Sequence, residues 1–237
     1  MTEQQATDRA YLRENLHAVT AALEKAAAAA GRIDAPRMVA AVKYAEDAEL
    51  RELLRLGVGE VGENRVQQLL AHWPLYENTN VRVHFIGHLQ KNKVKYIVDK
   101  VALIHSVDSA ELAEEISRRV VAKGLTVSVL VEVNSGREAA KSGVLPEEAE
   151  ALCRAILALP GLALQGFMTM APRCEDAAAY RAYFAETRRL AKALWQRLAL
   201  PGAPLLSMGM SESFEAAVAE GADIVRVGRR LFAGRPL

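Results

Sequence analysis

The sequence has little of what a secreted, membrane-embedded or nucleic-acid-binding protein requires. Its 237 residues include only two cysteines, Cys153 and Cys174, whose spacing gives neither a disulfide framework nor a set of metal ligands. No stretch is apolar for long enough to be a secretion signal or a membrane span. Thirty Lys and Arg residues against 29 Asp and Glu residues leave a formal net charge of +1, so no global field attracts nucleic acid or an anionic membrane. These absences predict a cytoplasmic protein that binds neither nucleic acid nor membranes.

What the chain does have is apolar mass arranged in a regular alternation. It is 51% hydrophobic and 25% charged, which is typical of a globular protein with one large core. Residues 6–30 favour a helix that stops at Gly31. Apolar, β-rich runs follow at residues 38–42, 58–61, 81–86, 102–107, 126–133, 162–168, 204–208 and 223–227. Helix-patterned segments lie between them at residues 48–56, 65–72, 89–98, 110–122, 147–159, 176–198 and 212–219.

This alternation predicts an α/β fold, a single TIM-type (β/α)8 barrel with an extra N-terminal helix. The predicted strands begin at intervals of roughly 20 to 40 residues, which is the pace of repeated βα units. An open doubly wound sheet has the same alternation and is the main alternative. The barrel is favoured because there are eight runs and because polar or glycine-rich residues gather where the runs end. No linker or break in composition divides the chain, so we expect one domain over residues 1–237.

Lys43 directly follows the first apolar run, in the sequence MVAAVKY. Because burying a lysine is costly, its amine either extends to solvent or is held in a cleft where it is used. In a barrel the carboxyl ends of all strands meet at one rim, where catalytic and binding residues normally lie. Lys141 is the alternative reactive lysine, although its polar loop, GREAAKSG, predicts an exposed position.

The last two predicted strands end in loops that suit a phosphate group. Ser207, Gly209 and Ser211 lie at the end of the seventh predicted strand, and Gly228 lies at the end of the eighth. Glycine-exposed amides and helix N-termini attract phosphate, and in these barrels the loops after strands seven and eight commonly bind it. The ordinary alternative is that Ser211 caps a helix and Gly228 only ends a strand.

Arg226 lies inside the eighth predicted strand, between two valines. If the valines face the helices, the arginine points into the barrel, because side chains alternate between the two faces of a strand. A buried guanidinium needs an acceptor, which is either an inward carboxylate such as Glu132 or Glu63, or an atom of a ligand.

Together, the amine, the two loops that suit a phosphate group (the phosphate cup) and the inward arginine predict a site for a phosphorylated aldehyde held as a Schiff base. Pyridoxal 5′-phosphate (PLP) is the obvious cofactor of this kind. Asn64, in the motif GENR, either caps a helix or lies on the rim, where its amide could contact the cofactor ring. His84 and His88, in HFIGH, follow a strand pattern and lack the glutamate of HExxH, so no metal site is predicted.

Several longer motifs resemble the pyridoxal phosphate homeostasis protein family, which shares the barrel of the alanine racemase N-terminal domain. The resemblance runs in order from about Val39 to Gly234 and rests on AVKY, VGENRVQQL, VHFIGHLQKNK, HSVDS, VNSGREAAKSG, FMTMAP and LSMGMSESFEAAVAEGADIVRVG. It implies a cofactor-binding role for Lys43, Asn64, Ser207, Arg226, Gly228 and Arg229. Within this set the resemblance implies that Lys43 forms the Schiff base with PLP, that Asn64 contacts the cofactor and that Arg226 is the partner of the pyridine nitrogen. The other three form the phosphate cup, to which Arg229 contributes its backbone amide.

Two positions depart from the family pattern. Arg229 stands where a threonine is common, so any side-chain contact to phosphate differs there. The neighbours of Lys43 also differ from the commoner SKT, which affects the pocket wall near Tyr44.

The resemblance implies a carrier that buffers PLP and delivers it to apo-enzymes, with no established turnover, and a monomer. We therefore expect no catalytic residues. The alternatives are a PLP-dependent amino-acid racemase and, more remotely, a Schiff-base aldolase that does not use PLP. An arginine at the ring nitrogen disfavours its protonation and weakens the ring as an electron sink, which disables much PLP chemistry but does not exclude racemisation. In alanine racemases the acid/base opposite the lysine resembles a tyrosine from a second, C-terminal domain, for which a chain ending at Leu237 is expected to have no room.

Overall fold

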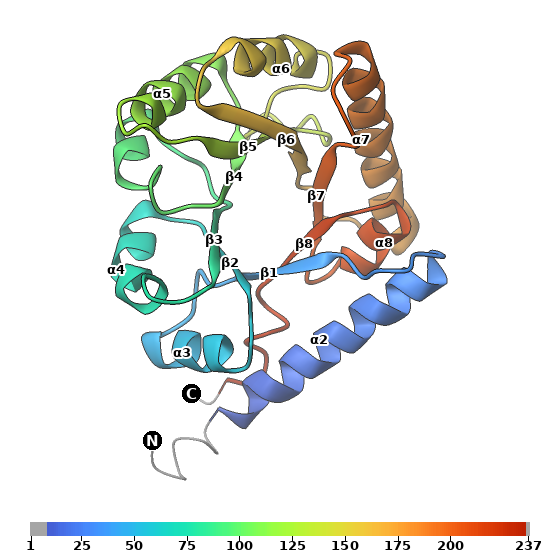
Figure 1. The fold of residues 1–237 in the computed structure, drawn as a ribbon. Coiled ribbons are helices and arrows are strands. Elements are labelled where there is room, and N and C mark those ends of the chain that lie inside the picture. The colour runs from blue at the N-terminus through green and yellow to red at the C-terminus, as the bar shows by residue number, and fades with distance from the viewer. Residues whose placement is uncertain (1–8, 236–237) are drawn as a thin grey trace.

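Pairing between the first and last strands closes the sheet of this protein into a barrel (Figure 1). The computed structural model describes residues 9–235. Its eight parallel strands follow one another around the barrel in chain order, and residues 37–40 of the first strand pair with residues 224–227 of the last. The predicted barrel is therefore confirmed, and the open doubly wound sheet is wrong.

Each of the first seven strands is followed by a helix or a 3-10 helix on the outside of the barrel (Figure 1). The strands are β1 (Arg37–Ala41), β2 (Glu60–Glu63), β3 (Arg82–Phe85), β4 (Leu103–Val107), β5 (Val127–Val133), β6 (Leu162–Thr169), β7 (Leu205–Met210) and β8 (Ile224–Val227). The helices are α2 (Ala10–Ala29), α3 (Asp47–Arg55), α4 (Val66–Tyr76), α5 (Ala110–Val121), α6 (Ala149–Ala158), α7 (Ala177–Arg197) and α8 (Phe214–Ala219), with the 3-10 helix η1 (Lys91–Tyr96) between β3 and β4. Over the described part of the chain, no helix combines the length and the hydropathy of a membrane span.

Several predicted elements differ from the structure in extent or type. The N-terminal helix begins at Ala10, and residues 6–8 of the predicted helix lie outside the described residues. The second strand begins at Glu60 and not at residue 58, because Gly57, with φ of +88°, and Gly59 place Val58 in the preceding turn. The helix predicted at residues 89–98 is a six-residue 3-10 helix that carries three lysines and no acidic residue in its first turn to offset their charge.

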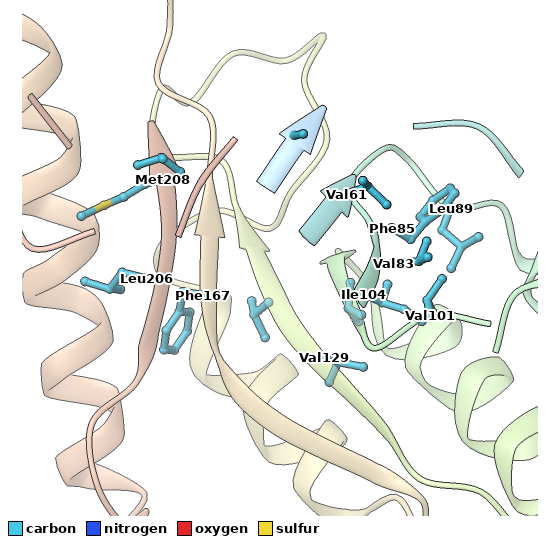
Figure 2. Close-up of a cluster of buried hydrophobic side chains, with 14 of the residues drawn as sticks. Val61, Val83, Phe85, Leu89, Val101, Ile104, Val129, Phe167, Leu206 and Met208 are labelled. Carbon is cyan, nitrogen blue, oxygen red and sulfur yellow. The ribbon is translucent and has the colours of Figure 1, made fainter. Parts of the chain in front are cut away.

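Two sets of buried side chains fill the molecule, one on each face of the sheet. The larger set lies between the strands and the helices, and Figure 2 shows part of it, including Phe167 on β6 and Leu206 on β7. The smaller set fills the barrel interior and consists of Val39, Leu103, Leu130, Met168 and Ile224. Ile224 lies two residues before Arg226 on the same face of β8, so the interior becomes polar toward the carboxyl ends of the strands.

Gly166 creates an irregularity in β6 that sets the register of the barrel. The pairing of β5 with β6 shifts by one residue between Val129 and Leu130, where Gly166 takes φ of +152°. A Cβ at this position would lie 2.1 Å from the carbonyl oxygen of Leu205 on β7. Only glycine fits this backbone approach without displacing a neighbouring strand.

Gly166→Ala is expected to lower the free energy of unfolding by roughly 2–4 kcal/mol, because it adds both backbone strain and a clash with β7. Chemical denaturation measures this change. Gly59→Ala is the matched control, since a Cβ there meets no atom within 4 Å, and it should change stability by less than about 0.5 kcal/mol. Equal stabilities for the two variants would contradict this assignment of the register.

Candidate functional site

A pocket of about 180 Å³ lies at the carboxyl ends of the strands, the rim where such barrels carry their sites. Five of the six residues expected to bind a cofactor line it together: Lys43, Asn64, Arg226, Gly228 and Arg229. Ile86, Met170 and Met210 provide apolar walls, which sequence reasoning did not assign. The barrel therefore brings together residues that come from both ends of the sequence.

Lys43 lies in the turn directly after β1, and a helix on the neighbouring unit fixes its backbone. The side-chain amide of Gln68 on α4 donates hydrogen bonds to the carbonyl oxygens of Lys43, at 2.9 Å, and Val42, at 3.3 Å. The lysine is half-buried, and its Nζ lies 4.8 Å from the ring centroid of Tyr44, which is 65% exposed. Sequence reasoning missed Gln68, although its position one helical turn after Asn64 in the same motif places it near the rim.

Asn64 is held against the loop that follows β3. A Cβ at Gly87 would lie 2.2 Å from the carbonyl oxygen of Asn64, so the two backbones pack directly on each other. Helix α4 begins at Val66, with Arg65 in the N-cap position. The alternative that Asn64 caps this helix is therefore wrong, and the residue lines the pocket.

Arg226 points into the barrel, as the alternation along β8 predicts. It is 4% exposed, and its guanidinium is held by backbone and hydroxyl oxygens. Nη1 donates to the carbonyl oxygen of Ser207 at 2.8 Å and to its hydroxyl at 2.6 Å, and Nη2 donates to the carbonyl oxygen of Thr169 at 2.9 Å. These acceptors hold the guanidinium firmly while leaving Nε and part of Nη2 as further donors.

The two carboxylates considered as partners of Arg226, Glu63 and Glu132, point to opposite faces of the sheet. Glu63 faces the helices and not the barrel interior, where it accepts a hydrogen bond from Tyr76 at 2.7 Å and contacts His72 at 2.6 Å. The prediction that Glu63 points inward is wrong because Glu63 shares the helix-facing side of β2 with Val61. Glu132 does point inward, yet among residues 9–235 no carboxylate hydrogen-bonds to Arg226.

Burial shifts the pKa values of both Arg226 and Glu132. It lowers the pKa of Arg226 to about 10, with the charge of Glu132 opposing the shift. It raises the pKa of Glu132 to about 7; the charge of Asp108 adds to this shift and that of Arg226 opposes it. The pocket thus contains a buried cation without an anion in contact, which is the electrostatic setting for an acceptor supplied by a ligand.

The two loops of the expected phosphate cup are joined through Ser211 and not through Ser207. The hydroxyl of Ser211 accepts hydrogen bonds from the backbone amides of Gly228 and Arg230, both at 3.3 Å, and the residue lines the pocket. It does not cap α8, which begins at Phe214, so that alternative is wrong. Ser207 is wholly buried beneath the pocket, where it contacts Arg226.

The remaining sequence candidates lie outside the centre of the pocket. Arg229 is exposed and its guanidinium lies 2.7 Å from the Glu212 carboxylate, so its side chain is held at the rim. Lys141 is exposed and lines an adjacent pocket that shares Met210 and Arg229 with the first. His88 is exposed, 3.4 Å from the Asp108 carboxylate, and residues 9–235 contain no cluster of His, Cys, Asp and Glu that could hold a metal ion.

Comparison with known proteins identifies relatives along nearly the whole chain. Residues 11–236 match the family described as the alanine racemase N-terminal domain. The pyridoxal phosphate homeostasis protein of Aquifex aeolicus is 41% identical over 223 residues, which cover 94% of this chain and 97% of the relative. The protein of the same name from Pseudomonas aeruginosa is 37% identical, with 94% and 95% covered.

Solved structures include proteins with the same fold. PipY of Synechococcus elongatus, determined with PLP bound, superimposes with a TM-score of 0.82 at 31% identity, covering 94% of this chain and all of PipY. An alanine racemase of Clostridium difficile has a TM-score of 0.74 at 17% identity, and this chain corresponds to 57% of its length. That second likeness shows the shared fold alone.

Replacing Glu132 by glutamine is expected to stabilise the protein at about pH 8 by on the order of 2 kcal/mol and to change little at about pH 5. The folded-state pKa of about 7 lies above the ordinary value of 4.5, so the contribution of Glu132 to stability is present at low pH and is lost as the pH rises toward 7. Urea denaturation of both proteins across this range measures the difference. Parallel stability curves for the two proteins would show that Glu132 does not titrate in this window.

Proposed function

The chain belongs to the alanine racemase N-terminal domain family and, within it, to the pyridoxal phosphate homeostasis proteins, and on this premise we propose that it binds PLP at the rim pocket and serves in PLP homeostasis. The observation that carries the proposal is the meeting of Lys43, the buried guanidinium of Arg226 and the Ser211–Gly228 loop pair in one pocket. PLP supplies an aldehyde that condenses with a primary amine, releasing water, and a phosphate that anchors the molecule.

The residues of the pocket fit these groups of PLP. Lys43 offers the only amine that lines this pocket in the described chain, and we propose it as the site of the Schiff base. The free N–H groups of Arg226 suit the pyridine nitrogen, which can accept a hydrogen bond, and Asn64 suits the ring substituents. The backbone amides of Gly228 and Arg229, together with the Ser211 hydroxyl, suit the phosphate, with Ser207 supporting this loop from below.

A carrier function fits the pocket better than catalysis. A permanently charged arginine beside the ring nitrogen disfavours the protonated pyridinium and weakens the ring as an electron sink. A two-base racemase also needs an acid/base across from the lysine, and Tyr44 is a poor substitute because it follows Lys43 directly and is largely exposed. We therefore propose a monomeric, single-domain cytoplasmic carrier without catalytic residues, which buffers PLP and supplies it to apo-enzymes.

Purified protein incubated with PLP is expected to be yellow, and Lys43→Ala should abolish the visible absorbance band of the bound cofactor. Borohydride reduction followed by peptide mass spectrometry should find the cofactor on Lys43. Lys141→Ala is the matched control, because this lysine lies in the adjacent pocket, and it should retain the band. A labelled Lys141 with an unlabelled Lys43 would contradict the proposed site.

Alanine racemisation should be undetectable with saturating PLP, since Tyr44, the side chain of the described pocket lining that could serve as a second base beside Lys43, is largely exposed. Circular dichroism of L-alanine and D-alanine solutions over many hours measures it. Steady turnover through many cycles that disappears in Lys43→Ala would replace the carrier proposal by the racemase.

A further inference from the structure

A chain of polar side chains, all of them buried except the half-buried Glu60, crosses the barrel interior beneath the pocket. It links one residue from each of five strands: Glu60 on β2, His84 on β3, His105 on β4, Ser207 on β7 and Arg226 on β8. From the arginine outward, the distances are 2.6 Å from Nη1 to the Ser207 hydroxyl, 2.9 Å from that hydroxyl to His105 Nδ1, and 2.9 Å from His105 Nε2 to His84 Nδ1. His84 Nε2 then lies 3.5 Å from a carboxylate oxygen of Glu60.

The arginine sets the favoured direction of the hydrogen bonds in this chain. A guanidinium can only donate, so the Ser207 hydroxyl accepts from Arg226, and its own single proton is directed to Nδ1 of His105, its other partner among residues 9–235. His105 therefore carries its proton on Nε2 and donates to Nδ1 of His84. His84 in turn carries its proton on Nε2, aimed at Glu60, and neither of these two facing atoms has another hydrogen-bond partner.

The charges at the two ends support this direction. Glu60 forms ion pairs with Arg37 at 3.0 Å and Arg82 at 3.7 Å, at the amino ends of the strands. Burial lowers the pKa of His84 to about 3, with Arg82 and Arg37 adding to the shift, and burial lowers the pKa of His105 well below its usual value. Both imidazoles are therefore neutral, and the chain carries no net charge between its ends.

A neutral, directional chain has a specific effect on the guanidinium. Ser207, His105 and His84 each donate a hydrogen bond in the direction away from Arg226. The lone-pair end of each group therefore faces the guanidinium, and the aligned dipoles stabilise the buried cation cooperatively. A carboxylate in the place of Ser207 would stabilise the cation as well, but it would compete with a ligand for the remaining N–H groups. Such barrels usually fill this layer with branched apolar side chains, so the polar chain calls for a reason beyond packing.

We propose that His105 is a positioning residue that acts through the Ser207 hydroxyl to hold Arg226, with its free N–H groups directed into the pocket. This role of His105 in cofactor binding rests on the proposed function, whereas the existence of the hydrogen-bond chain is independent of that function. His105 touches no ligand, and its effect reaches the pocket only through Ser207 and the guanidinium.

The directions within the chain can be tested in the wild-type protein without any cofactor. Long-range ¹⁵N–¹H NMR spectra of the histidine rings report which nitrogen carries the proton. His84 and His105 are expected as neutral Nε2–H tautomers from about pH 6 to about pH 8. An Nδ1–H tautomer or an imidazolium at either residue in this range would overturn the proposal.

The effect on binding can be tested with paired variants titrated with PLP. His105→Leu should weaken the affinity about tenfold and shift the visible band of the bound cofactor, because Ser207 then loses its acceptor and Arg226 loses its orientation. His105→Asn should bind within about threefold of wild type, since its Oδ1 stands near the position of Nδ1 and can accept from Ser207.

His72→Leu is the matched control, because it removes an equally buried imidazole from α4, outside the barrel, at the cost of its contact with Glu63. It should lose stability and keep the PLP affinity and the band position. Equal affinities for His105→Leu and wild type, or equal losses in His105→Leu and His72→Leu, would overturn the positioning role. A wild-type protein that binds no PLP would instead refute the proposed function and leave the NMR result standing.

Discussion

The structure of this site depends on one buried cation, the guanidinium of Arg226, to which no carboxylate of residues 9–235 hydrogen-bonds. Its neighbours are two carbonyl oxygens and one hydroxyl, and these hold it in place without neutralising it. Burying such a charge is costly unless it is paired or well hydrogen-bonded. The barrel meets this requirement by closing, because closure sets β8 beside both β7, which supplies Ser207, and β1, which carries Lys43 at its end.

Much of this arrangement follows from the sequence, and the remainder depends on contacts that no local pattern contains. The alternation Val225–Arg226–Val227 predicts an inward arginine, and the position of Lys43 after an apolar run predicts its place on the rim; both agree with the structure. The prediction that Glu63 points inward is wrong because Glu63 lies two residues after Val61 on the helix-facing side of β2, where Tyr76 and His72 of α4 contact its carboxylate.

The contact between His105 and Ser207 could not have been predicted from local patterns. These residues are 102 positions apart and meet across the barrel, where the register of both β4 and β7 is irregular. The same irregularity in β7 places Ser211, and not Ser207, at the pocket surface. Strand periodicity fails at such bulges, which commonly lie next to functional sites.

The alanine racemase shares the barrel of this protein. Because one fold can support many chemistries, the function has to be inferred from the rim residues and not from the fold. A crystal structure of the protein with PLP tests the central role of Arg226 most directly. We predict that the pyridine nitrogen lies within hydrogen-bonding distance of the Arg226 guanidinium. The phosphate should lie on the Ser211 and Gly228 loops, and the aldehyde carbon should be joined to Lys43. A cofactor whose ring nitrogen faces away from Arg226, or whose aldehyde carbon is joined to another lysine, would contradict this prediction.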